Sequence, residues 1–162
     1  MGIADHISAA DVVLDLGAAS KRSVLQALAT EAAARLGRPE RDVLDAVEAR
    51  ERLGSTALGR GVALPHTLIG GDRPPVVLFA RLRRPVDFEA KDEEPVDLVV
   101  LVLWPEASPE GFLPALSEIC RSLREPPVLR RLRSAKAPEE VASLLAGPPR
   151  AAAAAAPARD GA

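Results

Sequence analysis

The sequence predicts an α/β fold in which a mixed β-sheet is flanked by helices on both faces. Two segments, residues 76–82 and 96–103, are almost continuously apolar, which is typical of strands covered on both sides. Before and after them, apolar residues recur at helical spacing, which predicts amphipathic helices that pack on the sheet. With 162 residues, 48% of them apolar, the chain can form one domain with a sizeable core.

The N-terminal half is predicted to begin with a short strand at residues 12–16. Ser20 can cap a helix that Gly37 ends, and a second helix is expected at residues 39–51, because proline is favoured in a first helical turn. A further short strand is predicted at residues 62–64. The buried face of the first helix is expected to consist of Val24, Leu25, Leu28, Ala32 and Leu36.

The C-terminal half is predicted to contain a helix at residues 109–124 and two shorter helices at 127–134 and 138–146. Toward the end of the chain the composition changes, with six consecutive alanines between prolines and no amphipathic pattern. We therefore expect one folded domain over residues 1–146 and a disordered Ala/Pro-rich tail over 147–162.

Charge and composition exclude nucleic acid as a partner. Lys and Arg total 21 and Asp and Glu total 23, which gives a net charge of −2. A general nucleic-acid binder neutralises many phosphates and stacks bases on aromatic rings. This chain has only three Phe, one Trp and no Tyr. We therefore expect neither DNA nor RNA to be bound.

Neither a membrane nor a metal is expected as a partner. The N-terminus lacks the regions of a secretory leader, and no apolar stretch approaches the roughly 20 residues that span a bilayer. A cytoplasmic protein without membrane insertion is therefore predicted. The single cysteine, Cys120, has no second cysteine to pair with, and His6 and His66 are too far apart for a paired zinc motif. No cofactor is predicted, and His6 is expected to be exposed.

Residues 50–71 carry the features that point to chemistry. Their glycine–serine–threonine segment, residues 54–56, offers two hydroxyls and backbone N–H groups that can cradle an anion. Pro65 restricts the backbone directly before His66, which is predicted to lie at the end of a short strand. A lone histidine is more often a surface or hydrogen-bonded core residue than a functional one, so both interpretations stay open from the residues alone. The stretch has neither the Gly-Lys-Ser/Thr of a P-loop nor a G-x-G-x-x-G pattern.

Two blocks of sequence resemble a known family. Residues 50–66, RERLGSTALGRGVALPH, are similar to the active-site signature of the fructose/mannitol-type enzyme IIA domains (type-2 EIIA) of the bacterial phosphoenolpyruvate-dependent sugar phosphotransferase system. Residues 84–104, RPVDFEAKDEEPVDLVVLVLW, resemble the family's Pro-x-x-Phe-x-Ala-x-Asp-x-x-Pro-Val-Asp block. The resemblance covers about residues 12–145, is closest to the nitrogen-regulatory branch, and implies that family's α/β sandwich.

The resemblance implies a phosphohistidine carrier that acts in regulation of the nitrogen type or in a sugar phosphorelay. His66 matches the histidine that accepts a phosphoryl group from a histidine-containing phosphocarrier protein. Imidazole chemistry supports this role, because a neutral ring has a nitrogen lone pair that can attack phosphorus without a separate base. A regulated target protein, such as a transporter or a kinase, is the second partner that the resemblance implies.

The same signature implies roles for the residues before His66. Arg50 matches an arginine of the signature and would stabilise charge during phosphoryl transfer. A solvated salt bridge with Glu48 or Glu51 is the alternative for this arginine. The phosphoryl oxygens would be bound by Gly54, Ser55 and Thr56.

The chain also departs from the family pattern. Thr67 and Leu68 stand where the family usually continues Pro-His-Gly, often followed by Lys. The family usually has a second histidine on the helix after the apolar strand, and Phe112 occupies that position here. The Phe112 ring is expected to face the sheet and to flank His66. These departures favour an alternative function, a non-catalytic regulatory interaction module that keeps the fold and has lost efficient phosphotransfer.

Overall fold

The structure is a computed structural model that describes residues 3–147, and it has the predicted α/β architecture. Over these residues, six strands form one mixed sheet in the order β1-β5-β6-β3-β2, and β4 also pairs with β6. The strands are β1 (Val12–Leu16), β2 (Ala57–Gly59), β3 (Val62–Ala63), β4 (His66–Ile69), β5 (Val76–Val86) and β6 (Val96–Pro105).

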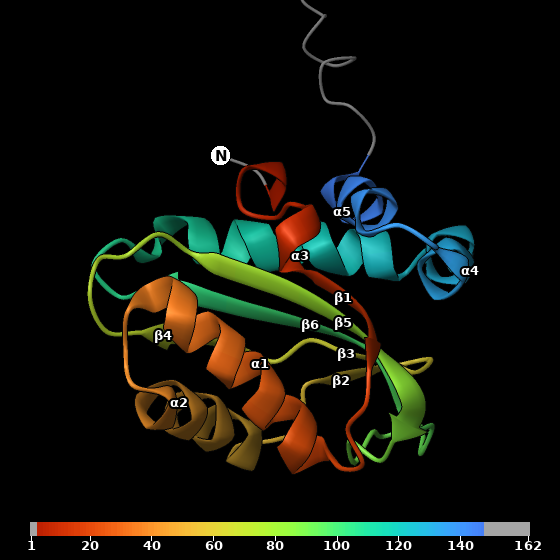
Figure 1. The fold of residues 1–162 in the computed structure, drawn as a ribbon, viewed down its shortest axis with the longest axis horizontal. Helices are drawn as coiled ribbons and strands as arrows, with labels where there is room; N and C mark the ends of the chain where they lie inside the picture. Colours follow the sequence, from red (N-terminus) through yellow and green to blue (C-terminus); the bar gives the residue numbers. More distant parts are fainter. Residues whose placement is uncertain (1–2, 148–162) are drawn as a thin grey trace, which may run out of the picture.

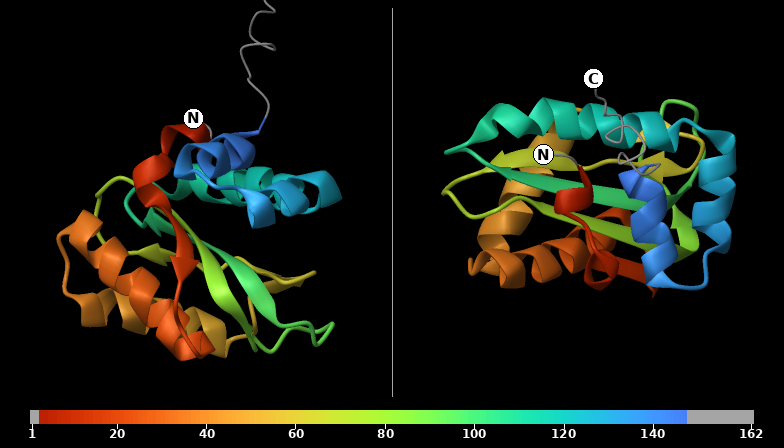
Figure 2. Two further views of the ribbon diagram at one scale, coloured as in Figure 1. Left: turned by 45° about the vertical axis from the view of Figure 1, so that its right-hand side comes forward. Right: turned by 90° about the horizontal axis from the view of Figure 1, so that it is seen from above.

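Helices cover both faces of this sheet, as the sequence predicts (Figure 1). One face carries α1 (Lys21–Leu36) and α2 (Glu40–Arg52). The elements on the opposite face are α3 (Phe112–Leu123), α4 (Pro126–Ser134), α5 (Pro138–Ala146) and the N-terminal 3-10 turns η1 (Ile3–Asp5) and η2 (Ala9–Asp11). Seen from above in Figure 2, the N-terminal segment lies beside α5, and the two are in contact.

The central strands bury both of their faces, which explains their continuous apolar sequences. Along β6, Leu101 and Leu103 pack in the core under α1 and α2, whereas Val100 and Val102 pack in the core under α3 and α5. Because successive strand residues point to opposite faces, consecutive positions from Leu98 to Trp104 all need apolar side chains. Full burial of one such side chain contributes about 1.5–3 kcal/mol.

Helix α1 has both of its predicted ends. The Ser20 hydroxyl accepts a 3.1 Å hydrogen bond from the Ser23 N–H, which satisfies one of the free donors at the helix start. Gly37 follows the last turn with φ +63°, a left-handed conformation that glycine adopts without strain. Helix α2 lies within one residue of its predicted range, and its last turn leads directly into the segment that contains His66.

The strand at His66 differs from the prediction. The sequence predicts one short strand that ends before His66, whereas the structure has two, β3 and β4, which both run parallel to β6. Ala63 pairs with Val99 and His66 pairs with Val102, so the register continues across the two residues between them. Pro65 interrupts the ladder because it has no N–H, although its carbonyl accepts a 3.0 Å hydrogen bond from the Val102 N–H. His66 therefore begins a strand.

The β2–β3 hairpin is a second element that the sequence analysis misses. Its turn runs through Gly59, Arg60 and Gly61, whose φ angles are +94°, +59° and +80°. At the φ of Gly61 a residue with a Cβ atom is strained, which favours glycine at this position. The hairpin folds the chain back and brings the end of α2 close to His66: the Leu64 N–H donates a 3.0 Å hydrogen bond to the Thr56 carbonyl.

At the C-terminal end, the helix predicted at residues 109–124 is divided into a 3-10 turn, η3 (Pro109–Gly111), and α3. The two shorter predicted helices are present as α4 and α5. Of the predicted tail over residues 147–162, all but Gly147 lies outside the described residues. Within residues 3–147, no helix is both long and apolar enough to cross a membrane.

Candidate active site around His66

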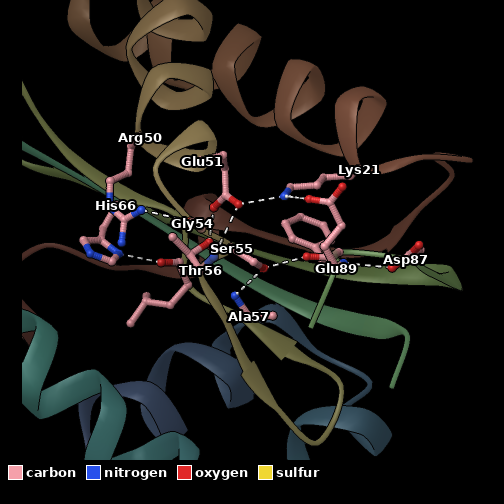
Figure 3. A network of polar contacts seen from close by, with 12 residues as sticks. Lys21, Arg50, Glu51, Gly54, Ser55, Thr56, Ala57, His66, Asp87 and Glu89 are labelled. Atoms are coloured by element: carbon pink, nitrogen blue, oxygen red, sulfur yellow. Dashed lines mark hydrogen bonds and ion pairs between the residues drawn. The ribbon is translucent and has the colours of Figure 1, made fainter. Parts of the chain in front are cut away.

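The orientation of the His66 ring is fixed by a hydrogen bond to a backbone carbonyl two residues earlier in the chain. Its Nδ1 lies 2.7 Å from the Leu64 carbonyl oxygen, and a carbonyl oxygen can only accept a hydrogen bond (Figure 3). Nδ1 therefore carries the proton and donates it, and in the neutral ring Nε2 has the free lone pair. The side chain is half-buried, so one side of the ring remains accessible.

Phe112 lies where the resemblance predicts it. The centroids of the His66 and Phe112 rings are 6.0 Å apart, with an angle of 53° between the ring planes. Phe112 is the first residue of α3 and also contacts Trp104, with 6.2 Å between the ring centroids. The expectation that Phe112 flanks His66 is thus confirmed. Its ring offers apolar contact but no hydrogen-bond donor.

Arg50 projects from the last turn of α2 toward the turn that precedes β2. Its Nη1 donates a 3.0 Å hydrogen bond to the Gly54 carbonyl. The alternative salt bridges do not form among residues 3–147, because Glu48 pairs with Arg22 at 3.2 Å and Glu51 pairs with Lys21 at 2.9 Å. Arg50 thus braces the turn with one donor, and a guanidinium has four further N–H groups.

The hydroxyls of Ser55 and Thr56 are engaged within the protein. Ser55 Oγ donates a 2.6 Å hydrogen bond to the Phe88 carbonyl and accepts one from the Ala57 N–H. Thr56 Oγ1 donates to the Glu51 carboxylate, and the Gly54 N–H donates to the Glu51 carbonyl at 3.1 Å. These donors build the turn in the unphosphorylated protein. Binding of phosphoryl oxygens by Gly54, Ser55 and Thr56 stays a prediction, and it requires these bonds to exchange.

A buried ion pair lies directly behind this turn. Glu51 is only 8% exposed, and its carboxylate lies 2.9 Å from the Lys21 ammonium, which also pairs with Glu89 at 3.2 Å. Burial lowers the pKa of Lys21, but the hydrogen bonds and charges of the two carboxylates outweigh it, so that the pKa is raised overall. The Lys21 ammonium also lies 5.3 Å from the Phe88 ring centroid, at cation–π distance.

This ion pair is the part of the site that the sequence analysis misses. Lys21 and Glu51 come from different helices, and 30 residues separate them in the sequence. A signal is nevertheless present, since Glu51 continues the buried stripe of Val43 and Val47 at four-residue spacing. A carboxylate on an apolar helix face needs a partner, because an unpaired buried charge is strongly unfavourable.

Comparison with known proteins decides the family. Residues 5–147 match the family described as "Phosphoenolpyruvate-dependent sugar phosphotransferase system, EIIA 2". The chain belongs to this family. It is 42% identical over 153 residues to a "Nitrogen regulatory protein" of Bradyrhizobium diazoefficiens, a match that covers 94% of this chain and 100% of the relative.

Solved structures of EIIA proteins have the same fold. The nitrogen regulatory protein IIA-Ntr of Neisseria meningitidis superimposes with a TM-score of 0.84 and 31% identity, over 88% of this chain and 98% of that one. The mannitol enzyme IIA of Escherichia coli, solved in complex with phosphorylated enzyme IIB, has a TM-score of 0.73 and 22% identity. That match covers 91% of this chain and 100% of the other, and at this identity it shows the fold alone.

Two exposed apolar side chains adjoin the site of this EIIA chain. Leu53 is 84% exposed and immediately precedes Gly54, and Leu113 is 71% exposed and immediately follows Phe112. Leu53 thus follows the end of α2, and Leu113 lies in the first turn of α3.

The second histidine corrects an expectation. His6 is half-buried rather than exposed, and its ring packs edge-on against Trp104 with 5.2 Å between centroids. Its Nε2 is buried and has no hydrogen-bond partner in the described part of the chain. Burial lowers the pKa of His6, and the neighbouring Asp5 carboxylate opposes this shift without cancelling it. No group of three or more potential metal ligands occurs among residues 3–147.

Proposed function

We propose that this EIIA chain is a phosphohistidine carrier in which Nε2 of His66 accepts a phosphoryl group from a histidine-containing phosphocarrier protein. The observation that carries the proposal is the 2.7 Å contact between Nδ1 of His66 and the Leu64 carbonyl. It commits the ring proton to Nδ1 and leaves the Nε2 lone pair available for attack on phosphorus. A half-buried ring at the start of β4 is accessible to a partner protein.

The transfer step balances without a further base or cofactor. As the Nε2–phosphorus bond forms, the phosphorus–nitrogen bond of the donor phosphohistidine breaks, and the donor imidazole leaves with the bonding electron pair. Nε2 has no proton to lose, and Nδ1 keeps its proton and its hydrogen bond to Leu64. Transfer of this kind depends on positioning and on compensation of the phosphoryl charge. Arg50 is the cation that we assign to that second task.

The proposed biological role is regulation of the nitrogen type. The relatives named nitrogen regulatory proteins support it, since one of them matches over its full length. The partners that we assign are the phosphocarrier protein and a regulated target, such as a transporter or a kinase. Leu53 and Leu113 are proposed to contact these partners, because a transient protein complex needs apolar surface at its centre.

The test is direct phosphorylation of the purified chain. The protein is incubated with phosphoenolpyruvate, the general phosphotransferase enzyme and a histidine-containing phosphocarrier protein, and its intact mass is measured. We expect a mass increase of one phosphoryl group. A control without the phosphocarrier protein should show no increase, and an unchanged mass in the complete mixture would contradict the proposal.

One observation favours a second candidate function, a regulatory interaction module without efficient phosphotransfer. The Phe112 ring fills the space beside His66, at 6.0 Å, where the family usually has another histidine. A phenyl ring cannot donate a hydrogen bond to a phosphoryl oxygen, and the transition state then loses that stabilisation. Binding of a target protein by a chain that stays unphosphorylated in the complete mixture would support this second function.

A further inference from the structure

We propose that Glu51 is a positioning residue for His66, which acts through Thr56 and Leu64 to hold the imidazole as the Nδ1–H tautomer. Its effect on phosphorylation rests on the function proposed above, whereas its effect on the tautomer does not. The proposal is carried by an unbroken series of hydrogen bonds that runs from the Lys21–Glu51 ion pair to the His66 ring (Figure 3).

The first part of the series fixes Thr56 to helix α2. Both donors of this residue are directed to the Glu51 carboxylate: Thr56 Oγ1 donates to one oxygen, and the Thr56 N–H donates to the other at 3.3 Å. Thr56 is 5% exposed, so water does not replace these bonds. The Lys21 ammonium lies 2.9 Å from Oε2, the carboxylate oxygen that also accepts the Thr56 N–H. The backbone at Thr56 therefore has one well-defined position relative to α1 and α2.

The second part transfers that position to His66. The Thr56 carbonyl accepts a 3.0 Å hydrogen bond from the Leu64 N–H, and the Leu64 carbonyl accepts the bond from Nδ1 of His66 at 2.7 Å. Leu64 is 2% exposed and lies between β3 and β4, where Pro65 interrupts pairing with β6. The hydrogen bond from Leu64 to Thr56 anchors the backbone just before Pro65, and the Leu64 carbonyl in this backbone accepts the bond from His66.

The chemistry of Glu51 makes this role specific to a charged carboxylate. Burying an ionised carboxylate is unfavourable unless it is paired and hydrogen-bonded. Glu51 has an ammonium, a hydroxyl and a backbone N–H as partners. Removing its charge weakens the bonds to Thr56, because hydrogen bonds to charged groups are stronger than those between neutral groups. Leu64 then loses part of its anchor, and the Nδ1–H tautomer loses its advantage over the Nε2–H tautomer.

The experiment reads the tautomer directly by ¹⁵N NMR of the imidazole side chains in the full, unphosphorylated chain. The chain has two histidines, so in a His6→Gln background all remaining histidine signals come from His66. In that background, we expect His66 to be present as the Nδ1–H tautomer alone. In both Glu51→Gln and Thr56→Val, we expect a mixture of the Nδ1–H and Nε2–H tautomers. We also expect phosphorylation of these variants to be about fivefold slower, the effect of one weakened hydrogen bond.

Matched controls separate positioning from general loss of stability. Thr56→Ser keeps the hydroxyl and should keep the tautomer. Glu48→Gln removes a carboxylate one turn earlier on α2 that pairs with Arg22 and has no bond to the turn, so it should behave like the wild type. Thr56→Val leaves the Lys21–Glu51 pair in place and decides the question if Glu51→Gln does not fold.

The outcomes distinguish this proposal from the proposed function. A single, unchanged tautomer in folded Thr56→Val would overturn the positioning role. A tautomer mixture in that variant would support positioning even if the wild-type chain proved unable to accept a phosphoryl group, in which case only the proposed function would fail.

Discussion

The two histidines of this chain lie in opposite environments, although an aromatic pair connects them. Trp104 contacts His6 at 5.2 Å between centroids, and its neighbour Phe112 contacts His66 at 6.0 Å. His66 has one ring nitrogen bonded to a carbonyl and one side open. In His6, by contrast, Nε2 is buried without a partner among residues 3–147. The same side chain thus keeps one ring nitrogen available at one position and is packed at the other.

The difference shows what makes a histidine a usable nucleophile in this fold. A nucleophilic ring needs a fixed tautomer, an accessible lone pair and a nearby cation to compensate phosphoryl charge. His66 has the first two, and Arg50 on the adjoining turn can supply the third. Asp5 adjoins His6 in the sequence and opposes the lowering of that ring's pKa by burial, as a nearby carboxylate does, and a carboxylate repels a phosphoryl group.

The largest expected effect is complete loss of phosphorylation in His66→Ala, with retention in His6→Ala. In His66, Nδ1 is bonded to the Leu64 carbonyl and Nε2 is left for attack, whereas Nε2 of His6 is buried and cannot reach a partner protein. Intact mass after incubation with the complete phosphotransfer mixture measures the result, and circular dichroism verifies the fold of both variants. If the mass increase survives His66→Ala and disappears with His6→Ala, the assignment of the site is wrong.

Next in size is the effect of Arg50. Arg50→Gln is expected to slow phosphorylation of His66 by about 100-fold, the range for removing one charged or hydrogen-bonding group that stabilises a transition state. Arg50→Lys should recover part of the rate, because it restores the charge but not the fork of N–H donors. Single-turnover mass spectrometry with the phosphorylated carrier protein gives the rates. A rate in Arg50→Gln equal to that of the wild type would show that the arginine only braces the Gly54 turn.

The regular elements could be predicted from the sequence because their signals are local. Successive residues of β5 and β6 are buried on opposite faces of the sheet, which requires a continuous apolar sequence. Ser20 and Gly37 are residue types that favour the start and the end of a helix. The short strands could not be predicted in this way. β2 has three residues and pairs with β3 across a tight turn, whereas β4 has four residues and pairs with β6, which is distant in the sequence. The conformation of both strands depends on these pairings.

The site shows the same division. The positions of His66 and Phe112 follow from a contiguous motif and from the apolar face of a helix, so the resemblance predicts their contact. The roles of the hydroxyls were harder to predict. The partner of Ser55 is the Phe88 carbonyl, 33 residues away, and the Glu51 carboxylate that accepts from Thr56 is held by Lys21 on another helix. Spacing within one motif carries no information about such contacts.

A smaller effect, in the opposite direction, is expected for Phe112→His. Restoring a hydrogen-bond donor 6.0 Å from the His66 ring should speed phosphorylation about tenfold, the lower end of the range for a group that orients a reactive neighbour. Phe112→Leu serves as the control, since it also removes the phenyl ring but adds no donor. The rates come from the same single-turnover measurement. Equal or slower transfer in folded Phe112→His would mean that the missing donor does not limit the rate.

The smallest expected effect concerns stability and belongs to His6. Burial lowers the pKa of His6, so below its ordinary value the unfolded chain binds more protons at this residue than the folded chain does. The stability that neutral His6 contributes is therefore present above about pH 6.5 and is lost as the pH falls through that value toward the lowered pKa. His6→Gln cannot take up the proton and should show a shallower loss of unfolding free energy than the wild type between pH 7.5 and 5.5, measured by urea denaturation.

Subtracting the two curves of unfolding free energy against pH removes the contribution of every titratable group that the two proteins share. If the difference between the curves does not change with pH, the buried ring does not control stability in this range.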